Sequence, residues 1–78
     1  MIKTYYRLAD DEPRFGQLVH CFTSIEVFKR DVKNMRRSGV PVDVPGMEMR
    51  FWEVKGEFVK ADGDDAIVRV LSARQIHI

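Results

Sequence analysis

The sequence predicts an α+β domain: one amphipathic helix packed on a bent antiparallel sheet of about 4–5 strands, in the order β(β)αβββ. Three observations predict this class. Residues 2–8 are β-prone and alternate between two faces, residues 23–39 have helical periodicity with start and stop signals, and the chain alternates again from residue 47. The 78 residues allow a single small globular domain, residues 1–78.

The first half of the predicted sheet comes from two segments. In residues 2–8 one face carries Ile2, Thr4, Tyr6 and Leu8, as expected of a strand. Residues 9–16 contain three consecutive acids, a proline and a glycine, which indicates a loop. Residues 17–22 are then expected to form a short second strand.

The helix is predicted between Thr23 and Gly39. Thr23 and Glu26 have the spacing of a capping box, and Phe22 is placed to pack on Val27 as a hydrophobic staple. Gly39 follows the last turn, where a left-handed cap is favoured. The side that would face the sheet consists of Ile25, Phe28, Val32 and Met35.

The chain after the helix is expected to start extended and to continue as strands. Residues 40–46 contain two prolines, which push their predecessors out of helical geometry. From residue 47 the apolar residues alternate, but the alternation changes parity at Phe51 and Trp52. This change predicts a bulge or sharp bend there, with Gly56 as a second irregular point.

A tight hairpin is predicted near the end of the chain. The segment 62–65 reads Asp-Gly-Asp-Asp, and Asp-Gly favours a two-residue turn. Residues 66–71 would form the return strand, and the alternation of residues 75–78 predicts a last short strand.

The composition is that of a nearly neutral globular protein. Hydrophobic residues make up 45% and charged residues 32%, and the formal net charge is +1. This balance excludes a uniformly acidic DNA mimic and a uniformly basic DNA coat, so electrostatic recognition must come from local patches. A single cysteine, Cys21, excludes an intramolecular disulfide and is expected to be a small buried hydrophobe. Without a signal peptide or a long apolar run, a cytoplasmic protein that does not contact membranes is expected.

No motif of an enzyme or of a metal site is visible. His20 and His77 have no cysteine or carboxylate at ligand spacing, and His20 is expected to be half-buried. The acids of residues 62–65 lack the spacing of an EF-hand. We therefore expect a protein that is not an enzyme, with no cofactor, no metal and no small-molecule substrate. The acidic clusters 10–12 and 62–65 are interpreted as solvated turns, the alternative being contact with a basic groove on a partner.

The basic side of the helix is the first candidate binding surface. Residues 23–39 carry five positive and two negative side chains, a net +3, in a chain whose remainder has eight positive and ten negative ones. This side is either a solvated helix face, with its last arginines favoured by the helix dipole, or a docking face for a negative partner. The triplet Arg50-Phe51-Trp52 is a second candidate, the alternative being a buried Trp52. The candidate partner-binding residues are Lys29, Arg30, Lys33, Arg36, Arg37, Arg50 and Trp52.

In size and layout the chain resembles the anti-CRISPR proteins, small phage-encoded inhibitors of CRISPR–Cas defence complexes. The resemblance covers the whole chain and is carried by the strand 2–8, the capped helix 23–39 and the β-rich half from residue 47. It implies a non-enzymatic protein that docks on and blocks a larger protein or nucleoprotein complex, such as a CRISPR effector, in the host cytoplasm. Many such inhibitors are acid-rich and resemble DNA, and this chain departs from that pattern.

Two alternatives stay open. One is a small nucleic-acid-binding module that places the basic helix 24–38 directly on phosphates, with weak and salt-sensitive binding because only a few phosphates would be contacted. The other is a small enzyme or toxin subunit without a familiar motif.

Overall fold

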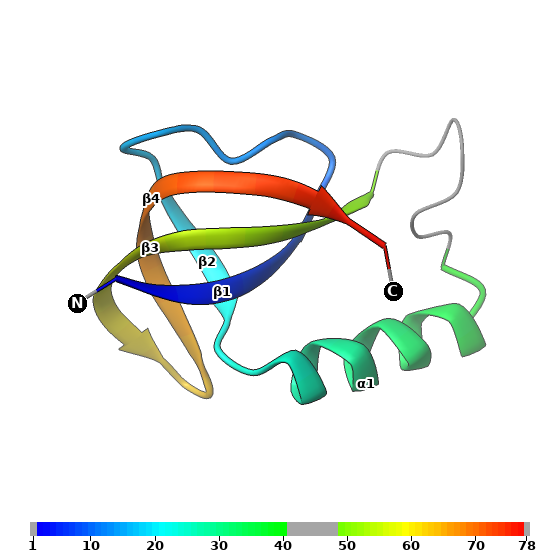
Figure 1. Ribbon diagram of the computed structural model, residues 1–78. Helices are drawn as coiled ribbons and strands as arrows, with labels where there is room; N and C mark the ends of the chain where they lie inside the picture. The colour runs from blue at the N-terminus through cyan, green and yellow to red at the C-terminus, as the bar shows by residue number, and fades with distance from the viewer. Residues whose placement is uncertain (1, 41–48, 78) are drawn as a thin grey trace.

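A computed structural model describes residues 2–40 and 49–77, and it confirms the α+β class. Along the chain the elements are β1 (Ile2–Ala9), β2 (Leu18–Phe22), α1 (Ile25–Arg37), β3 (Arg50–Asp62) and β4 (Asp65–Ile76). The strands form a closed antiparallel barrel in the order β1-β2-β4-β3, and α1 lies across its outside (Figure 1). The expected extended stretch at 40–46 falls, apart from its first residue, outside the described residues.

Four strand pairings close the barrel, and one of them, between β1 and β2, is very short. β1 pairs with β3 along its whole length, and β2 pairs with β4 along its whole length. The pairing of β1 with β2 is reduced to Tyr6 opposite Phe22. Beside this seam the guanidinium of Arg7 donates a 2.7 Å hydrogen bond from Nη1 to the carbonyl oxygen of His20. The barrel is thus closed on one side by a single residue pair and one side-chain hydrogen bond.

The two long strands after the helix form one hairpin. Asp62 pairs with Asp65 around a two-residue turn in which Gly63 has a φ of 61°, so the predicted tight hairpin is confirmed. The separate last strand predicted at residues 75–78 is not seen in the described part of that range. Gln75 and Ile76 are instead the end of β4, because β3 extends far enough back to pair with them.

The irregular points of β3 differ in part from the expectation. The register shifts between Lys55 and Gly56, which confirms Gly56 as an irregular point, and it shifts again between Phe58 and Lys60. Phe51 and Trp52 pair regularly, so the bulge predicted there is wrong. The parity changes at this position because both faces of the strand are buried.

Two hydrophobic clusters bury the two faces of β1 and β3. The barrel interior contains Tyr5, Ala9, Val19, Cys21, Trp52, Val54, Ala66, Val68 and Val70. The second cluster lies between α1 and the outside of the barrel. Its buried members are Phe28, Val32 and Phe51, and the partly buried ones are Tyr6, Leu8, Phe22, Ile25, Met35, Met49 and Ile76. All four residues of the predicted apolar helix stripe belong to this second cluster.

The start of α1 lies one residue later than predicted. Ser24, not Thr23, is the N-cap, because its Oγ accepts a 3.5 Å hydrogen bond from the amide of Val27 and donates one of 2.7 Å to Glu26. The hydroxyl of Thr23 instead donates to the carbonyl oxygen of Asp64 in the β3–β4 turn. This long-range bond removes Thr23 from the predicted capping box.

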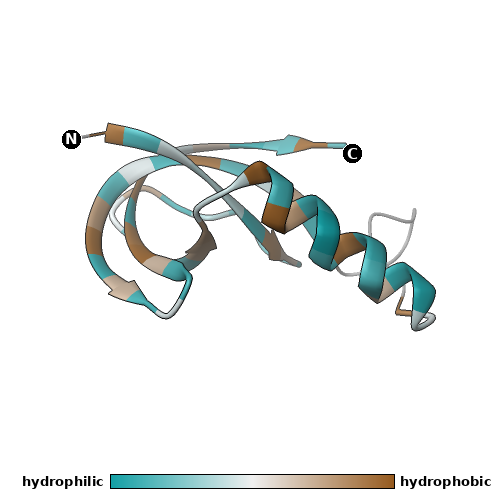
Figure 2. Cartoon of the chain, turned by 90° about the horizontal axis from the view of Figure 1, so that it is seen from below, coloured by the Kyte–Doolittle hydropathy of each residue, from teal (hydrophilic) through white to brown (hydrophobic). Residues whose placement is uncertain are grey.

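The end of α1 is as predicted and has a Schellman motif. Gly39 has a φ of 80°. Its amide donates to the carbonyl oxygen of Arg36, and the amide of Val40 donates to that of Met35. Hydrophobic residues recur along α1 among hydrophilic ones (Figure 2), at the spacings of three and four that place them on one side of an amphipathic helix. Capping and packing together fix the helix, and with it the side that points away from the barrel.

Candidate functional site

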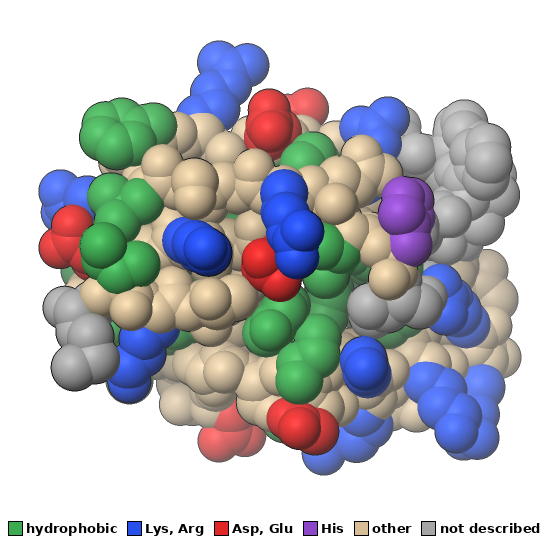
Figure 3. All heavy atoms as spheres, in the orientation of Figure 1, with side chains coloured by type: hydrophobic (Ala, Val, Ile, Leu, Met, Phe, Trp, Pro, Cys, Tyr) green, Lys and Arg blue, Asp and Glu red, His purple; other side chains and the backbone are tan. Residues whose placement is uncertain are grey.

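The predicted cations of α1 all lie at the surface. Lys29, Lys33, Arg36 and Arg37 follow at spacings of four, three and one, which puts them on one side of the helix. In Figure 3 lysine and arginine side chains gather over α1. Among the described residues, no acidic side chain lies within ion-pairing distance of Lys29, Lys33 or Arg37. The hydrogen bond from Ser24 and, more weakly, the charge of Lys29 lower the pKa of Glu26, so Lys29 has an acidic neighbour one turn away on the helix.

The other two helix cations have contacts within the chain. Arg30 pairs with its neighbour Asp31 at 3.7 Å (Nε to Oδ1), an exposed contact that adds little stability. The guanidinium carbon of Arg36 lies 5.5 Å from the ring centroid of Phe51, so this side chain covers the cluster beneath the helix. Arg36 has a packing role in addition to its charge.

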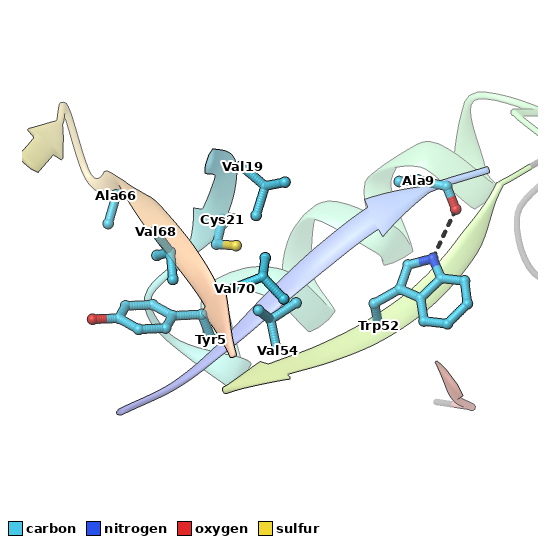
Figure 4. Packing of buried hydrophobic residues seen from close by; sticks show 9 residues of the cluster. All are labelled: Tyr5, Ala9, Val19, Cys21, Trp52, Val54, Ala66, Val68 and Val70. Atoms are coloured by element: carbon cyan, nitrogen blue, oxygen red, sulfur yellow. Dashed lines mark hydrogen bonds between the residues drawn. The ribbon is translucent and has the colours of Figure 1, made fainter. Parts of the chain in front are cut away.

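The second predicted contact point, Arg50 with Trp52, holds the barrel together. Only 6% of Trp52 is exposed, and its Nε1 donates a 3.0 Å hydrogen bond to the carbonyl oxygen of Ala9 (Figure 4). Arg50 is exposed, and its Nη1 donates at 2.9 Å to the carbonyl oxygen of Asp10. Of the two interpretations of Trp52, the buried one is confirmed and the exposed anchor is wrong, because its ring lies in the barrel core beside Ala9 (Figure 4). The change of parity at Phe51 was the sequence signal for a strand buried on both faces.

Sequence reasoning missed the part of the sheet that lies beside the helix. Phe51 and Ile76, directly opposite each other, are covered by α1. Strand alternation places Glu53 and Arg74 on the same outer face, and Lys55 and Ser72 beyond them. The helix therefore covers one end of this face, and the remainder lies open next to its basic side.

Two hollows mark this open region. The helix-side hollow has a volume of about 430 Å³ and is lined by Lys29, Val32, Arg36 and His77. The sheet-side hollow, of about 380 Å³, is lined by Glu53, Lys55, Ser72, Ala73 and Arg74. The two hollows share no lining residue, and Gln75 and Ile76 separate them along the chain. We call the pair of hollows the α1–β4 groove, because residues 72–77 run past both. Apolar side chains are visible in the seam between sheet and helix (Figure 3).

The groove is positive on both sides. Lys29 and Arg36 stand on the helix, and Lys55 and Arg74 stand on the sheet, against one carboxylate, Glu53. Glu53 accepts two hydrogen bonds from Arg74, at 3.0 Å from Nε and 3.4 Å from Nη2. These bonds, and then the carboxylate charge, raise the pKa of Arg74. The sheet side of the groove thus contains one ion pair of the chain itself, in which Arg74 donates two hydrogen bonds to Glu53.

The remaining candidate groups are placed as follows. His20 is about half-buried, as expected: 47% of its side chain is exposed, and it alternates with the buried Val19 and Cys21. Its Nε2 lies 3.2 Å from Asp62 and 3.5 Å from Asp65. Within the described ranges, no group of three or more histidine, cysteine or acidic residues is arranged to hold a metal ion. Cys21 is fully buried, as predicted. Burial raises the pKa of its thiol to about 11 against the lowering effect of Arg7, so the thiol is protonated at neutral pH.

Comparisons of the chain with protein-family models, with curated proteins and with solved structures returned no match. No helix in residues 2–40 and 49–77 is long and apolar enough to cross a membrane. The class that the described residues define is a small antiparallel barrel with one external helix, whose basic side borders a positively charged groove.

Proposed function

We propose that this protein is a non-enzymatic binding protein that docks on, and sterically blocks, a larger protein or nucleoprotein complex. The basic side of α1 makes the contact with a negatively charged surface of that complex. The single observation that supports this proposal is the presence of Lys29, Lys33 and Arg37 on one exposed helix side, with no acidic side chain of the described residues within ion-pairing distance.

The helix is suited to recognition because it is fixed on the barrel. Phe28 and Val32 are almost fully buried beneath it, and both of its ends are capped. A preorganised surface loses less conformational freedom on binding than a mobile one. Clustered charges of one sign also speed encounter with a partner of the opposite sign.

A CRISPR effector complex is one partner of the required kind, and the resemblance in size and layout to anti-CRISPR proteins supports it as the first to be tested. Such a complex presents acidic protein surfaces and nucleic-acid backbone, both of which attract a basic helix. The near-zero net charge of the chain agrees with recognition through a patch.

A small nucleic-acid-binding module is the second candidate function. The spacing of the basic residues along one side of α1 favours it. The helix has 13 residues, which at 1.5 Å per residue is about 20 Å, enough to meet only a few phosphates. Binding to naked DNA by so few contacts falls steeply with added salt.

The test uses the wild-type chain and a triple variant, Lys29→Glu with Lys33→Glu and Arg37→Glu. Arg36 is left in place because it packs on Phe51. Both proteins are assayed for binding and inhibition of purified CRISPR effector complexes, and as affinity baits with identification of the captured proteins by mass spectrometry. A complex that binds the wild type and is lost by the folded triple variant supports the proposal. Unchanged binding by that variant removes α1 from the site.

Gel-shift assays separate the two candidate functions. The wild-type chain is titrated on naked duplex DNA at about 50 mM and about 200 mM salt. Tight binding at the lower concentration that collapses at the higher one, together with loss in the triple variant, would establish the nucleic-acid module and contradict docking on a protein.

A further inference from the structure

We infer that the α1–β4 groove receives an acidic peptide segment of the partner, so that its carboxylates are held by helix and sheet together. This inference rests on the proposed function and specifies which part of a partner the molecule takes. It also extends the contact surface from the helix, where the sequence placed it, to residues of β3 and β4.

The position of the groove makes it part of the same surface as the helix cations. Lys29 lines the helix-side hollow and also belongs to the basic side of α1. His77 lines that hollow and directly follows β4, whose residues Ser72 and Arg74 line the sheet-side hollow. A chain segment lying along the last residues of β4 therefore passes both hollows while the partner body contacts the helix.

The charges favour an anionic occupant. Four positive side chains, Lys29, Arg36, Lys55 and Arg74, line the groove against one negative one, Glu53. Arg36 and His77 already have contacts within the chain, so neither is required to be free. Lys29 and Lys55, one on each side, have no ion pair with another described residue and carry the inference.

Carboxylates fit this surface better than a nucleic-acid strand does. The two-pronged contact of Arg74 with Glu53 already pairs that guanidinium within the chain, so Lys55 is the sheet-side cation that has no ion pair with a described acid and would meet an incoming carboxylate. Single-stranded nucleic acid is bound largely by stacking on exposed aromatic rings. The strongly exposed aromatic residues of the described chain, Phe15 and Phe58, do not line either hollow.

The first experiment measures binding of a fluorescein-labelled decaglutamate by fluorescence anisotropy, with an oligothymidine of equal charge as the competing probe. The wild type is compared with Lys29→Glu, with Lys55→Glu and with the matched control Arg14→Glu. Arg14 is exposed in the loop between β1 and β2, on the side of the barrel away from α1 (Figure 1). We expect each groove variant to weaken decaglutamate binding about tenfold and the control less than about twofold, since only close charges couple strongly.

The second experiment locates the probe on the molecule. In a ¹⁵N-labelled sample, decaglutamate should shift the amide resonances of Val32 and Ala73 and leave that of Phe15 unchanged. Absence of binding, equal weakening by all three variants, or resonance shifts outside the groove would overturn the inference. Tighter binding of oligothymidine at the same residues would overturn the peptide as occupant and assign the groove to nucleic acid.

The two proposals fail in different ways. If a partner complex is lost by the triple helix variant but retained by Lys55→Glu, the docking function stands and the groove is not part of it. If decaglutamate binds in the groove but no complex depends on the helix cations, the groove is an acidic-peptide site and the proposed function is wrong.

Discussion

The indole nitrogen of Trp52 donates a hydrogen bond to the carbonyl oxygen of Ala9, 43 residues earlier in the chain. The bond ties the end of β1 to the beginning of β3, and the ring fills the barrel interior beside it. It also satisfies a polar atom in a place that water does not reach. The residue that the sequence offered as a binding anchor is therefore a structural link.

Replacing Trp52 by Phe should lower the free energy of unfolding by about 1–3 kcal/mol, because the carbonyl of Ala9 loses its buried donor. Urea denaturation followed by circular dichroism measures this. The comparison variant is Arg50→Ala, which removes an exposed bond to Asp10 and should cost about 0.5–1.5 kcal/mol. Equal stability of the wild type and Trp52→Phe would show that the indole bond contributes nothing.

Replacing Phe28 by Ala should cost about 3–5 kcal/mol, because a fully buried ring is removed from the cluster under α1. The ring of Phe28 stacks with Tyr6, tilts against Phe22 and meets Phe51 edge-on. Thermal and urea unfolding give the change. Lys33→Ala on the exposed side of the same helix should stay within about 0.5 kcal/mol of the wild type. A small effect of Phe28→Ala would mean that α1 does not pack on the barrel as described.

Replacing Gly56 by Ala should destabilise the protein by about 1–3 kcal/mol through overpacking. A Cβ atom at this position would lie 2.4 Å from the backbone oxygen of Arg69 and 2.5 Å from Cγ1 of Val68. The backbone oxygen moves only if the β3–β4 register moves with it. Glu57→Ala, at the exposed next position, is the control for strand propensity. Wild-type stability of Gly56→Ala would contradict the close strand approach.

Stability should fall as the pH rises from about 9 to about 11. Burial raises the pKa of the Cys21 thiol to about 11 from its ordinary value of 9.0, so in this range the unfolded chain releases a proton that the folded chain retains. Proton release by the unfolded state favours unfolding, so the thiol makes a negative contribution to the slope of unfolding free energy against pH in this range and almost none well below about pH 9. The folded thiol should also react slowly with a disulfide reagent at neutral pH.

The control for this slope is Cys21→Ala. Burial also raises the pKa of Tyr5, which contributes in the same direction at the upper end of the range. The difference between the wild type and Cys21→Ala isolates the thiol. Identical alkaline slopes for the two proteins would rule out a buried, proton-retaining Cys21.

The helix could be predicted from the sequence because its signals are local. Its apolar stripe, its basic side and the glycine at its end all lie within residues 23–39. The N-cap was misplaced by one residue because the hydroxyl of Thr23 is used by Asp64, which no local pattern reveals. The bulge expected at Phe51 and Trp52 is wrong for a similar reason: alternation presumes one buried face, whereas the first residues of β3 are buried on both.

The groove lay beyond sequence reasoning because it depends on which face of the sheet carries the helix. Lys55 and Ser72 are opposite each other because two irregularities cancel: β3 has one extra residue between Phe58 and Lys60, and β4 has one, Leu71, across from the Lys55–Gly56 step. Arg74 meets Glu53 through the same pairing. Counting back from the turn pairs these residues correctly, but the sequence does not show that α1 packs on Phe51 and Ile76, which puts Glu53, Lys55, Ser72 and Arg74 on the face that carries the helix.

Phe51 and Trp52 are consecutive in the chain, yet one belongs to the cluster under α1 and the other to the barrel interior. Because one peptide bond joins these two residues, loss of packing in one cluster displaces the backbone that packs in the other. The two clusters are therefore expected to unfold together. An isolated helix of this length would not persist in water. The protein should consequently unfold in one cooperative transition, and the helix that arranges the basic side chains should be lost at the same temperature as the barrel.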